Sequence, residues 1–351
     1  MKEAVDFLID WRKQVILKAV VTDYVRTAEP VGSAMLVERY RFGVKSATIR
    51  SELAELAEMG YLHQPHTSAG RMPSDRGYRF FVDWLMDSAS LDNRQADRAL
   101  GKLNPHRSEV DIIIDQTCRI LADLAQYTSM ATSPAVKDAT ISHISIVNIG
   151  GDRLLAVVVL SNGRVLHELL EIDPKSRRMD SVRATNFLTG RLAGRELATV
   201  CAGPMESVPE DAADMAELLG KVMRFLRREA ESDGETDVHL EGAGYMMHQP
   251  EFKDAERLET VLSLLDRRRM LYRLFSSVYL GPDVTVIIGS ENPLDEMRDC
   301  SFVASKYCIN GRVAGSIGVL GPTRMDYPRA VSAVHFMAAN LGELLTSLSV
   351  A

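Results

Sequence analysis

Long apolar runs are missing from this 351-residue sequence. Its longest purely apolar stretches are short, such as 154–160, whereas a helix that crosses a bilayer needs about 20 apolar residues. Residues 1–11 also lack the uninterrupted apolar stretch of a signal peptide, because Glu3, Asp6 and Asp10 interrupt them. We therefore expect a cytoplasmic protein with no membrane contact.

Cysteine is scarce as well, and its spacing excludes the usual cysteine sites. The chain has four cysteines, none in a C-x-x-C pair or at metal-ligand spacing from a histidine: Cys118, Cys201, Cys300 and Cys308. We expect free thiols that are buried as small hydrophobic side chains, with no disulfide and no zinc site.

Catalytic and cofactor motifs are absent too. The sequence contains no G-x-S-x-G, no H-E-x-x-H and no G-x-x-x-x-G-K-[ST]. Gly242 and Gly244 are spaced like the start of a dinucleotide fingerprint, but its third glycine is missing. We therefore predict no catalytic residues, no cofactor and no metal. A hydrolase or transferase is an open alternative that a convergent pocket of titratable side chains would indicate.

The sequence also lacks the net positive charge that many DNA-binding proteins carry, since its formal net charge is −7 at pH 7. The acidic residues are unevenly distributed, however. Residues 1–83 hold 12 basic and 11 acidic side chains. Residues 39–81 hold seven basic and four acidic side chains, together with His63 and His66. Because the distribution of charge matters more than its sum, the N-terminal segment is compatible with DNA binding.

Three short helices separated by breaks are predicted in the first sixty residues. The first has an apolar stripe at i, i+3, i+4 and i+7, formed by Leu17, Val20, Val21 and Tyr24. Pro30 and Gly32 interrupt it, because proline lacks the backbone donor and glycine is permissive. Ser33 and Ser46 are suitable N-caps for the second and third helices, and Gly60 is suited to end the third.

The third helix has the pattern of a recognition helix. Ile49, Leu53 and Leu56 form its buried stripe. On the other side its first turn is small, hydroxylated or basic, whereas its acidic residues come later. Such an end can enter the major groove, donate hydrogen bonds to base edges and present free backbone N–H groups to phosphate. The alternative is an amphipathic helix whose small-residue face packs against another protein element.

A hairpin is predicted directly after this helix. Residues 61–64 are a short strand candidate, and 65–73 form a polar turn with Gly70 and Arg71 at its tip. Ser74 then caps a fourth helix. A hairpin after a recognition helix is typical of a wing, whose arginine reaches phosphate or the adjacent minor groove. The alternative for Arg71 is a solvated loop charge.

The rest of the chain alternates between strand and helix patterns. Residues 88–105 are polar and predict a linker. Helical periodicity marks four segments: 110–127, 212–231, 255–276 and 327–348. β-branched or leucine-rich runs bounded by turn signals predict strands at 144–149, 154–160, 165–172, 284–289, 302–309 and 313–320. Strands thus flank a mostly helical middle, which predicts one α/β sheet interrupted by a helical insertion.

Several of these stretches resemble the HrcA family of heat-inducible transcription repressors. Four blocks carry the resemblance in the N-terminal part: Ser46–Arg50, Met59–Leu62, Gln64–Arg71 and Gly77–Asp83. Three more carry it in the C-terminal third: Ile288–Asn292, Asp299–Val303 and Gly318–Tyr327. His63 and Met72 depart conservatively from the family pattern. The resemblance spans essentially the whole chain and is weakest in 184–274.

The resemblance implies an α+β multidomain protein. It implies a winged helix-turn-helix DNA-binding domain at 1–88, a linker at 89–108, and a GAF-like α/β domain made of 109–183 and 275–351. It also implies a largely helical dimerising domain inserted at 184–274.

The resemblance further implies a repressor of heat-shock chaperone operons of the groE and dnaK type. Such a repressor binds duplex DNA at an inverted-repeat operator, CIRCE, as a homodimer, and the chaperonin GroEL is its partner. A dimer is also expected because one recognition helix reads too few base pairs to select a site in a genome. The alternative is a ligand-sensing GAF-type regulator of another regulon, for which a polar-lined cavity in the α/β domain would be the sign.

The predicted DNA contacts lie near the second and third helices, in the hairpin turn and at the start of the fourth helix. They are Ser33, Lys45, Ser46, Thr48, Arg50, Ser51, Thr67, Ser68, Gly70, Arg71 and Arg76. We expect Arg50 to read a base edge. We expect Arg71 to contact the DNA phosphate backbone, so that it contributes about equally to binding of any DNA sequence.

Overall fold

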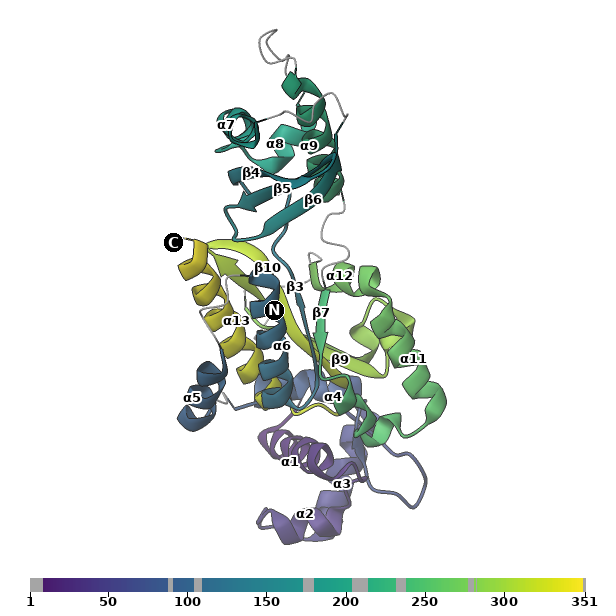
Figure 1. The fold of residues 1–351 in the computed structure, drawn as a ribbon. Coiled ribbons are helices and arrows are strands. Elements are labelled where there is room, and N and C mark those ends of the chain that lie inside the picture. Colours follow the sequence, from purple (N-terminus) through teal and green to yellow (C-terminus); the bar gives the residue numbers. More distant parts are fainter. Residues whose placement is uncertain are drawn as a thin grey trace.

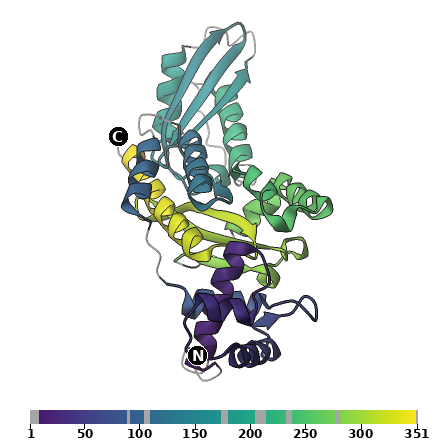
Figure 2. The ribbon, with the colours of Figure 1, turned by 90° about the horizontal axis from the view of Figure 1, so that it is seen from below.

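A computed structural model shows three bodies in a row, with the N-terminal part at one end and an inserted part at the other (Figure 1). It describes residues 9–87, 91–103, 109–172, 180–203, 214–231, 238–276, 281 and 283–349. We call residues 9–87 the N-terminal body and residues 134–231 the inserted body. The main body comprises the other described residues and lies between these two in both views (Figures 1 and 2).

The N-terminal body follows the predicted order of helices and hairpin. Its elements are α1 (Trp11–Thr27), α2 (Ser33–Arg39), α3 (Ser46–Glu58), β1 (Leu62–His63), β2 (Met72–Pro73), α4 (Asp75–Phe80) and the π-helical turn η1 (Phe81–Leu85). The predicted end of α3 is confirmed, since Gly60 has a φ of +79° and the Tyr61 N–H donates to Leu56 O at 2.9 Å. The predicted cap of α4 is confirmed too, because Ser74 Oγ accepts from the Gly77 N–H at 3.1 Å.

The two serines predicted as caps of α2 and α3 lie one residue inside each helix. Gly32 and Lys45 hold the cap positions, and neither makes a side-chain capping bond. Ser33 Oγ and Ser46 Oγ instead lie 3.0 Å apart and hydrogen-bond to each other. The cap prediction is therefore wrong by one position, because the two hydroxyls join the starts of α2 and α3.

The main body is built on one five-stranded antiparallel sheet of order β7–β3–β10–β9–β8. The strands are β3 (Thr128–Thr132), β7 (Val238–Glu241), β8 (Thr285–Ile288), β9 (Cys300–Ile309) and β10 (Arg312–Pro322). One face is covered by α6 (Val110–Ala125) and α13 (Tyr327–Ser349), and the other by α11 (Ala255–Asp266) and α12 (Arg268–Ser276) (Figure 1).

Local turn chemistry sets the register of β9 and β10. Asn310 and Gly311 have φ angles of +52° and +75°, as a two-residue hairpin turn requires, and they place Ile309 opposite Arg312. The hairpin predicted at this position is confirmed.

The predicted linker contains a helix. α5 (Asn93–Lys102) packs on α6, with Ala99 buried and Lys102 Nζ 3.1 Å from Asp123 Oδ2. The helix predicted over 255–276 is in turn broken at Arg267 into α11 and α12. Periodicity alone did not show this break, because both halves keep their apolar residues on the side that faces the sheet.

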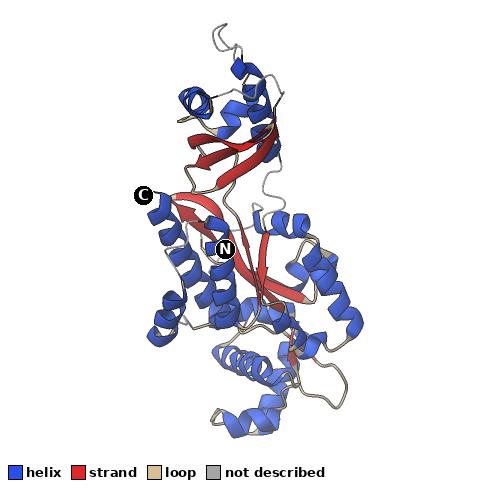
Figure 3. Cartoon of the chain, viewed as in Figure 1, coloured by secondary structure: helices blue, strands red, loops and turns tan. Residues whose placement is uncertain are grey.

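The inserted body has a sheet and a core of its own. β4 (Ile141–Gly150), β5 (Arg153–Leu160) and β6 (Val165–Glu171) form a separate three-stranded antiparallel sheet (Figure 3). Its helices are α7 (Ser181–Leu192), α8 (Leu197–Ala202) and α9 (Asp214–Glu231), and they cover one face of that sheet.

This grouping differs from the expected division into 109–183 with 275–351 and an insertion at 184–274. The strands β4–β6 were expected in the same sheet as the C-terminal strands, but Leu154, Ala156 and Val158 pack on α7–α9 instead. The main sheet is completed by β3 and β7, which pair with each other and which the sequence did not predict. Thr128–Thr132 shows no apolar–polar alternation, and the alternation in Val238–Glu241 spans only four residues.

All four cysteines are free thiols, as predicted. Cys118 and Cys300 are buried, and this burial raises the pKa of each thiol. Cys308 is exposed, so the expected burial is wrong at that position, and Cys201 is half-buried. In the described part of the chain, no helix has both the length and the apolar character that crossing a bilayer requires.

Candidate nucleic-acid interface

A third extended segment joins the β1–β2 hairpin of the N-terminal body. Val31 and Arg71 exchange two backbone hydrogen bonds of 2.9 Å each in an antiparallel bridge. Gly70 lies so close to this bridge that an added Cβ would be 2.5 Å from Val31 O, so the position requires glycine. The bridge therefore holds the hairpin loop, residues 64–71, beside the start of α2.

Gln64 shapes this hairpin loop from within. Its Nε2 donates to Thr67 O and to Ala69 O, each at 2.9 Å. The Ala69 N–H also donates to His66 O at 2.9 Å, which closes the turn. Sequence reasoning missed Gln64, because a glutamine that bonds only to backbone carbonyls leaves no spacing pattern.

A concavity of about 500 Å³ lies between the start of α2, α3 and the hairpin loop. It is lined by Val31, Gly32, Ser33, Ala34, Arg50, Leu53, Gln64, Thr67, Ser68, Ala69, Gly70 and Arg71. Six of the predicted DNA contacts are among these residues: Ser33, Arg50, Thr67, Ser68, Gly70 and Arg71. The fold thus brings together residues that lie up to 38 positions apart in the sequence, from Ser33 to Arg71.

Four further predicted contacts lie at the N-terminal end of α3. Lys45 and Ser51 are exposed there, and Thr48 is half-buried. Ser46 is half-buried and is bound to Ser33, which gives it a structural partner. This end of the helix therefore presents one cation and hydroxyl groups next to the concavity.

Arg76 lies apart from the other predicted contacts, at the opposite end of α3. Its Nη1 donates to Met59 O at 2.9 Å, and its guanidinium lies 4.5 Å from the centroid of the Tyr61 ring. Met59 is the C-cap of α3. The structure thus engages Arg76 in closing the C-terminal end of that helix.

Arg71 does not lie at the tip of the turn, where the sequence analysis placed it. Its backbone is fixed by Val31 at the base of the hairpin loop, and its side chain is half-buried. Its Nε is buried and has no hydrogen-bond partner among the described residues. The non-local pairing with Val31 decides this position, and the pairing leaves no local sequence signal.

Two of the three acidic residues of α3 are neutralised from α1. Glu52 lies 2.9 Å from Lys13 Nζ and 3.5 Å from an Arg12 nitrogen. Glu55 also reaches Lys13 Nζ, at 3.0 Å. The hydrogen bond with Glu52 is the main reason that the pKa of Lys13 is raised.

The cations at or beside the concavity have no such partners among the described residues. In the ranges that the structure describes, no carboxylate pairs with Lys45, Arg50 or Arg71. With Glu52 and Glu55 paired elsewhere, the start of α3 (45–51) and the hairpin loop (64–71) carry uncompensated positive charge. Such a surface attracts polyanions.

A second polar cluster, in the main body, resembles a catalytic triad. His239 Nε2 lies 2.9 Å from Ser133 Oγ, and His239 Nδ1 lies 2.6 Å from Asp115 Oδ1. A fourth group changes the chemistry, because Ser133 Oγ donates to Asp111 Oδ1 at 2.8 Å.

The direction of the serine hydrogen bond in this cluster does not suit a serine nucleophile. Burial alone would lower the pKa of His239, but hydrogen bonds to Asp111 and Asp115 outweigh it and raise this pKa. The hydroxyl of Ser133, which is itself buried, donates its proton to Asp111 and not to His239. We therefore interpret the cluster as structural and not as the pocket of a hydrolase or transferase.

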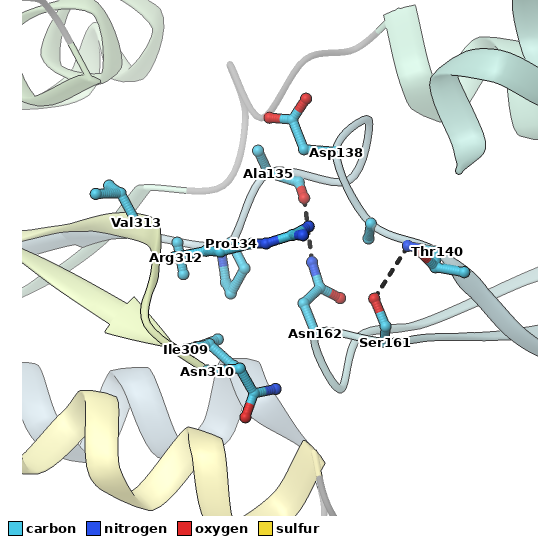
Figure 4. A pocket seen from close by; sticks show the side chains of 12 residues that line it. Pro134, Ala135, Asp138, Thr140, Ser161, Asn162, Ile309, Asn310, Arg312 and Val313 are labelled. Atoms are coloured by element: carbon cyan, nitrogen blue, oxygen red, sulfur yellow. Dashed lines mark hydrogen bonds between the residues drawn. The ribbon is translucent and has the colours of Figure 1, made fainter. Parts of the chain in front are cut away.

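Side chains fill one place where a ligand sensor could hold its ligand. Between the main sheet and α11–α12, residues such as Leu264, Phe275 and Phe302 fill the space, and the two phenylalanine rings pack 5.7 Å apart. A polar-lined pocket of about 500 Å³ does occur, but it lies at the junction with the inserted body (Figure 4). There Asn162 donates to Ala135 O at 3.1 Å, a bond that joins the two strands' connecting segments beside the pocket.

Known proteins resemble the chain over nearly its full length. Residues 111–331 match the family described as HrcA protein C terminal domain. The heat-inducible transcription repressor HrcA of Pelotomaculum thermopropionicum is 36% identical over 337 residues, which cover 96% of this chain and 97% of that protein. HrcA of Moorella thermoacetica is 36% identical over 341 residues, which cover 97% of this chain and 99% of that protein.

A solved structure shares the fold as well. It is the crystal structure of a protein described only as hypothetical, with a TM-score of 0.69 and 21% sequence identity. The similarity covers 97% of this chain and 99% of that one, so it includes the N-terminal body and both other bodies.

Proposed function

The chain belongs to the HrcA family of heat-inducible transcription repressors, and we propose that it represses heat-shock chaperone operons of the groE and dnaK type. Its binding site is the inverted-repeat operator CIRCE, and it acts as a dimer. Repression takes place in the cytoplasm, where bacterial DNA is located. The chaperonin GroEL is its protein partner, as the family resemblance implies.

The N-terminal body acts as a winged helix-turn-helix in this proposal. α3 is the recognition helix, and the hairpin loop at 64–71 is the wing. The observation that supports this proposal most strongly is the concavity between them. Arg50 and Arg71 both line it, and neither has a carboxylate partner among the described residues. In this proposal Arg50 of α3 reads a base edge, and Arg71 of the wing holds a phosphate.

Dimerisation is assigned to the open face of the inserted sheet. Cross-strand pairs place Val147 beside Leu155 and Leu155 beside Leu169 in one apolar row, with Val159 beside Val165 in another. Val147, Val165 and Leu169 are 44–47% exposed, while α7–α9 cover the opposite face. We assign a second copy of this chain to the face, because an inverted repeat requires two recognition helices related by a two-fold axis.

The proposal is tested by fluorescence anisotropy with the full-length protein. One duplex carries the inverted repeat from a chaperone-operon promoter, and a second of equal length carries the same bases in scrambled order. We expect binding to the repeat to be tighter by about 10³-fold or more, with an affinity that falls steeply as salt rises. Equal affinity for the two duplexes would contradict a sequence-specific repressor.

A further inference from the structure

The hydrophobic core of the N-terminal body continues into the main body without a break. Tyr78 of α4 and Tyr327 of α13 are both buried at this junction, and their ring centroids are 5.7 Å apart. The core of the inserted body, in contrast, is separate. The orientation of the candidate interface is therefore set by its packing on the main body.

Arg79 of α4 makes the first polar contact of this junction. Its Nε lies 2.7 Å from Glu291 Oε1, and its Nη2 donates to Glu291 Oε2 and to Val286 O. Beside it, the Ser290 N–H donates to Asp75 Oδ2 at 2.8 Å. The hydrogen bond with Glu291 is also the main reason that the pKa of Arg79 is raised. Two side chains of α4 are thus held by the turn that follows β8.

Arg324, just before α13, makes the second polar contact and is 9% exposed. It donates to both carboxylate oxygens of Glu251, at 2.6 and 3.2 Å, and to Gln249 Oε1 at 3.2 Å. Its Nη1 donates to the carbonyl of Val25 in the last turn of α1. A cation of the main body thus caps the C-terminal end of α1, where the helix dipole favours positive charge.

We propose that Arg79 and Arg324 are positioning residues for DNA recognition. Together they hold α4 and α1 so that the two interfaces of a dimer face two half-sites at one fixed spacing. The inference rests on the proposed function. Neither arginine lines the concavity, so neither is needed for contact with a single half-site.

The expected consequence concerns the second half-site. When two linked interfaces have the correct geometry, the second binding step is intramolecular, and affinity exceeds that of one site by about 10²–10⁴. A loosened junction lowers the effective concentration of the second interface but leaves each interface intact. The loss therefore shows on a full repeat and not on a half-site.

The test uses full-length Arg79→Ala and Arg324→Ala variants, with Arg257→Ala as the matched control. Arg257 is exposed on α11 and has no ion pair among the described residues. Anisotropy measures binding to a half-site duplex, to the full inverted repeat, and to a repeat whose spacer is longer by about half a helical turn, roughly 5 base pairs. Sedimentation shows whether each variant is still a dimer.

We expect both variants to bind the half-site like the unaltered protein and to lose about tenfold or more in affinity for the full repeat. They also discriminate less against the lengthened spacer, and the Arg257→Ala control matches the unaltered protein. Arg324→Lys keeps one donor toward Val25 O and regains part of the affinity for the full repeat.

Two results would overturn the inference. One is a full-repeat affinity equal to that of the unaltered protein. The other is an equal loss on half-site and full repeat, since that places the defect inside the N-terminal body. If the unaltered protein itself fails to distinguish the repeat from unrelated duplex, the proposed function fails, which is a separate outcome.

Discussion

Arg50 and Arg71 line the same concavity but are held in different ways. Arg50 is exposed on α3, whereas Arg71 is fixed through its backbone to Val31. We expect Arg50→Ala to cost about 1–3 kcal/mol on the operator and to relax specificity at one base pair. Arg71→Ala should weaken binding evenly across sequences and reduce the salt slope by about one. Anisotropy titrations at several salt concentrations measure both effects.

Arg312→Ala is a suitable control for this pair, because Arg312 is an exposed arginine of the β9–β10 hairpin, far in the sequence from the interface. Its affinity for the operator should match that of the unaltered protein. If Arg50→Ala and Arg71→Ala both bind the operator as the control does, the interface is wrongly assigned.

His239 gives the stability of the main body a pH dependence. Burial would lower its pKa, but the hydrogen bonds to Asp111 and Asp115 raise it above the ordinary value of 6.5. The protonated imidazole therefore stabilises the fold fully below pH 6.5, and this contribution is lost as the pH rises through the raised pKa. The hydrogen bond from His239 in turn lowers the pKa of Asp111 to about 2.

We expect the free energy of unfolding to decline with rising pH above 6.5 in the unaltered protein and to decline less in His239→Gln. Urea denaturation at a series of pH values measures this difference. His143→Gln, at an exposed position of the inserted sheet, should keep the decline. Parallel pH profiles for His239→Gln and the unaltered protein would show that the cluster does not contribute.

At the level of elements, the hairpin loop depends on one side chain for its shape. Gln64 donates to the carbonyls of Thr67 and Ala69 and is itself exposed. We expect Gln64→Ala to weaken operator binding by about 1 kcal/mol, the value of a lost hydrogen bond, with little change in thermal stability. Anisotropy and a melting curve measure the two quantities. An unchanged affinity would show that the loop keeps its shape without Gln64.

The open face of the inserted sheet is the second element with a testable role. Leu169→Lys places a charge in the apolar row formed with Leu155 and Val147. We expect the proposed dimer to dissociate into monomers at micromolar concentration, because a lysine buried without a partner costs several kcal/mol. Analytical ultracentrifugation measures the mass.

Val182→Lys is the control for this variant. Val182 is 64% exposed but lies on α7, which packs on the opposite face of the sheet. The Val182→Lys protein should sediment like the unaltered one. If Leu169→Lys also leaves the mass unchanged, the dimer forms through another surface.

At the scale of the whole molecule, the chain has two independent ways of joining its parts. The N-terminal and main bodies share one hydrophobic core, although residues 88–90 separate them in the sequence. The inserted body packs around its own core, which is separate from the core that the N-terminal and main bodies share. The arrangement couples the candidate DNA interface to the main sheet more tightly than to the inserted body.

Much of the fold followed from local patterns in the sequence. The cap at Ser74, the end of α3 at Gly60 and the Asn310–Gly311 hairpin were predicted, because each depends on a few neighbouring residues and their backbone angles. The grouping of strands was not predictable in the same way. It depends on which apolar face meets which helix, and that contact joins residues far apart in the chain.

The sequence by itself determined the helices and hairpin of the N-terminal body, the cations and hydroxyls they carry, and the resemblance to one family. Only the tertiary structure decided that Val31 holds Arg71 at the base of the loop and that Lys13 neutralises Glu52. It also decided that Arg324 caps α1 from the main body. The physical reason is range: periodicity and caps act over a few residues, whereas these contacts join segments brought together only by folding of the whole chain.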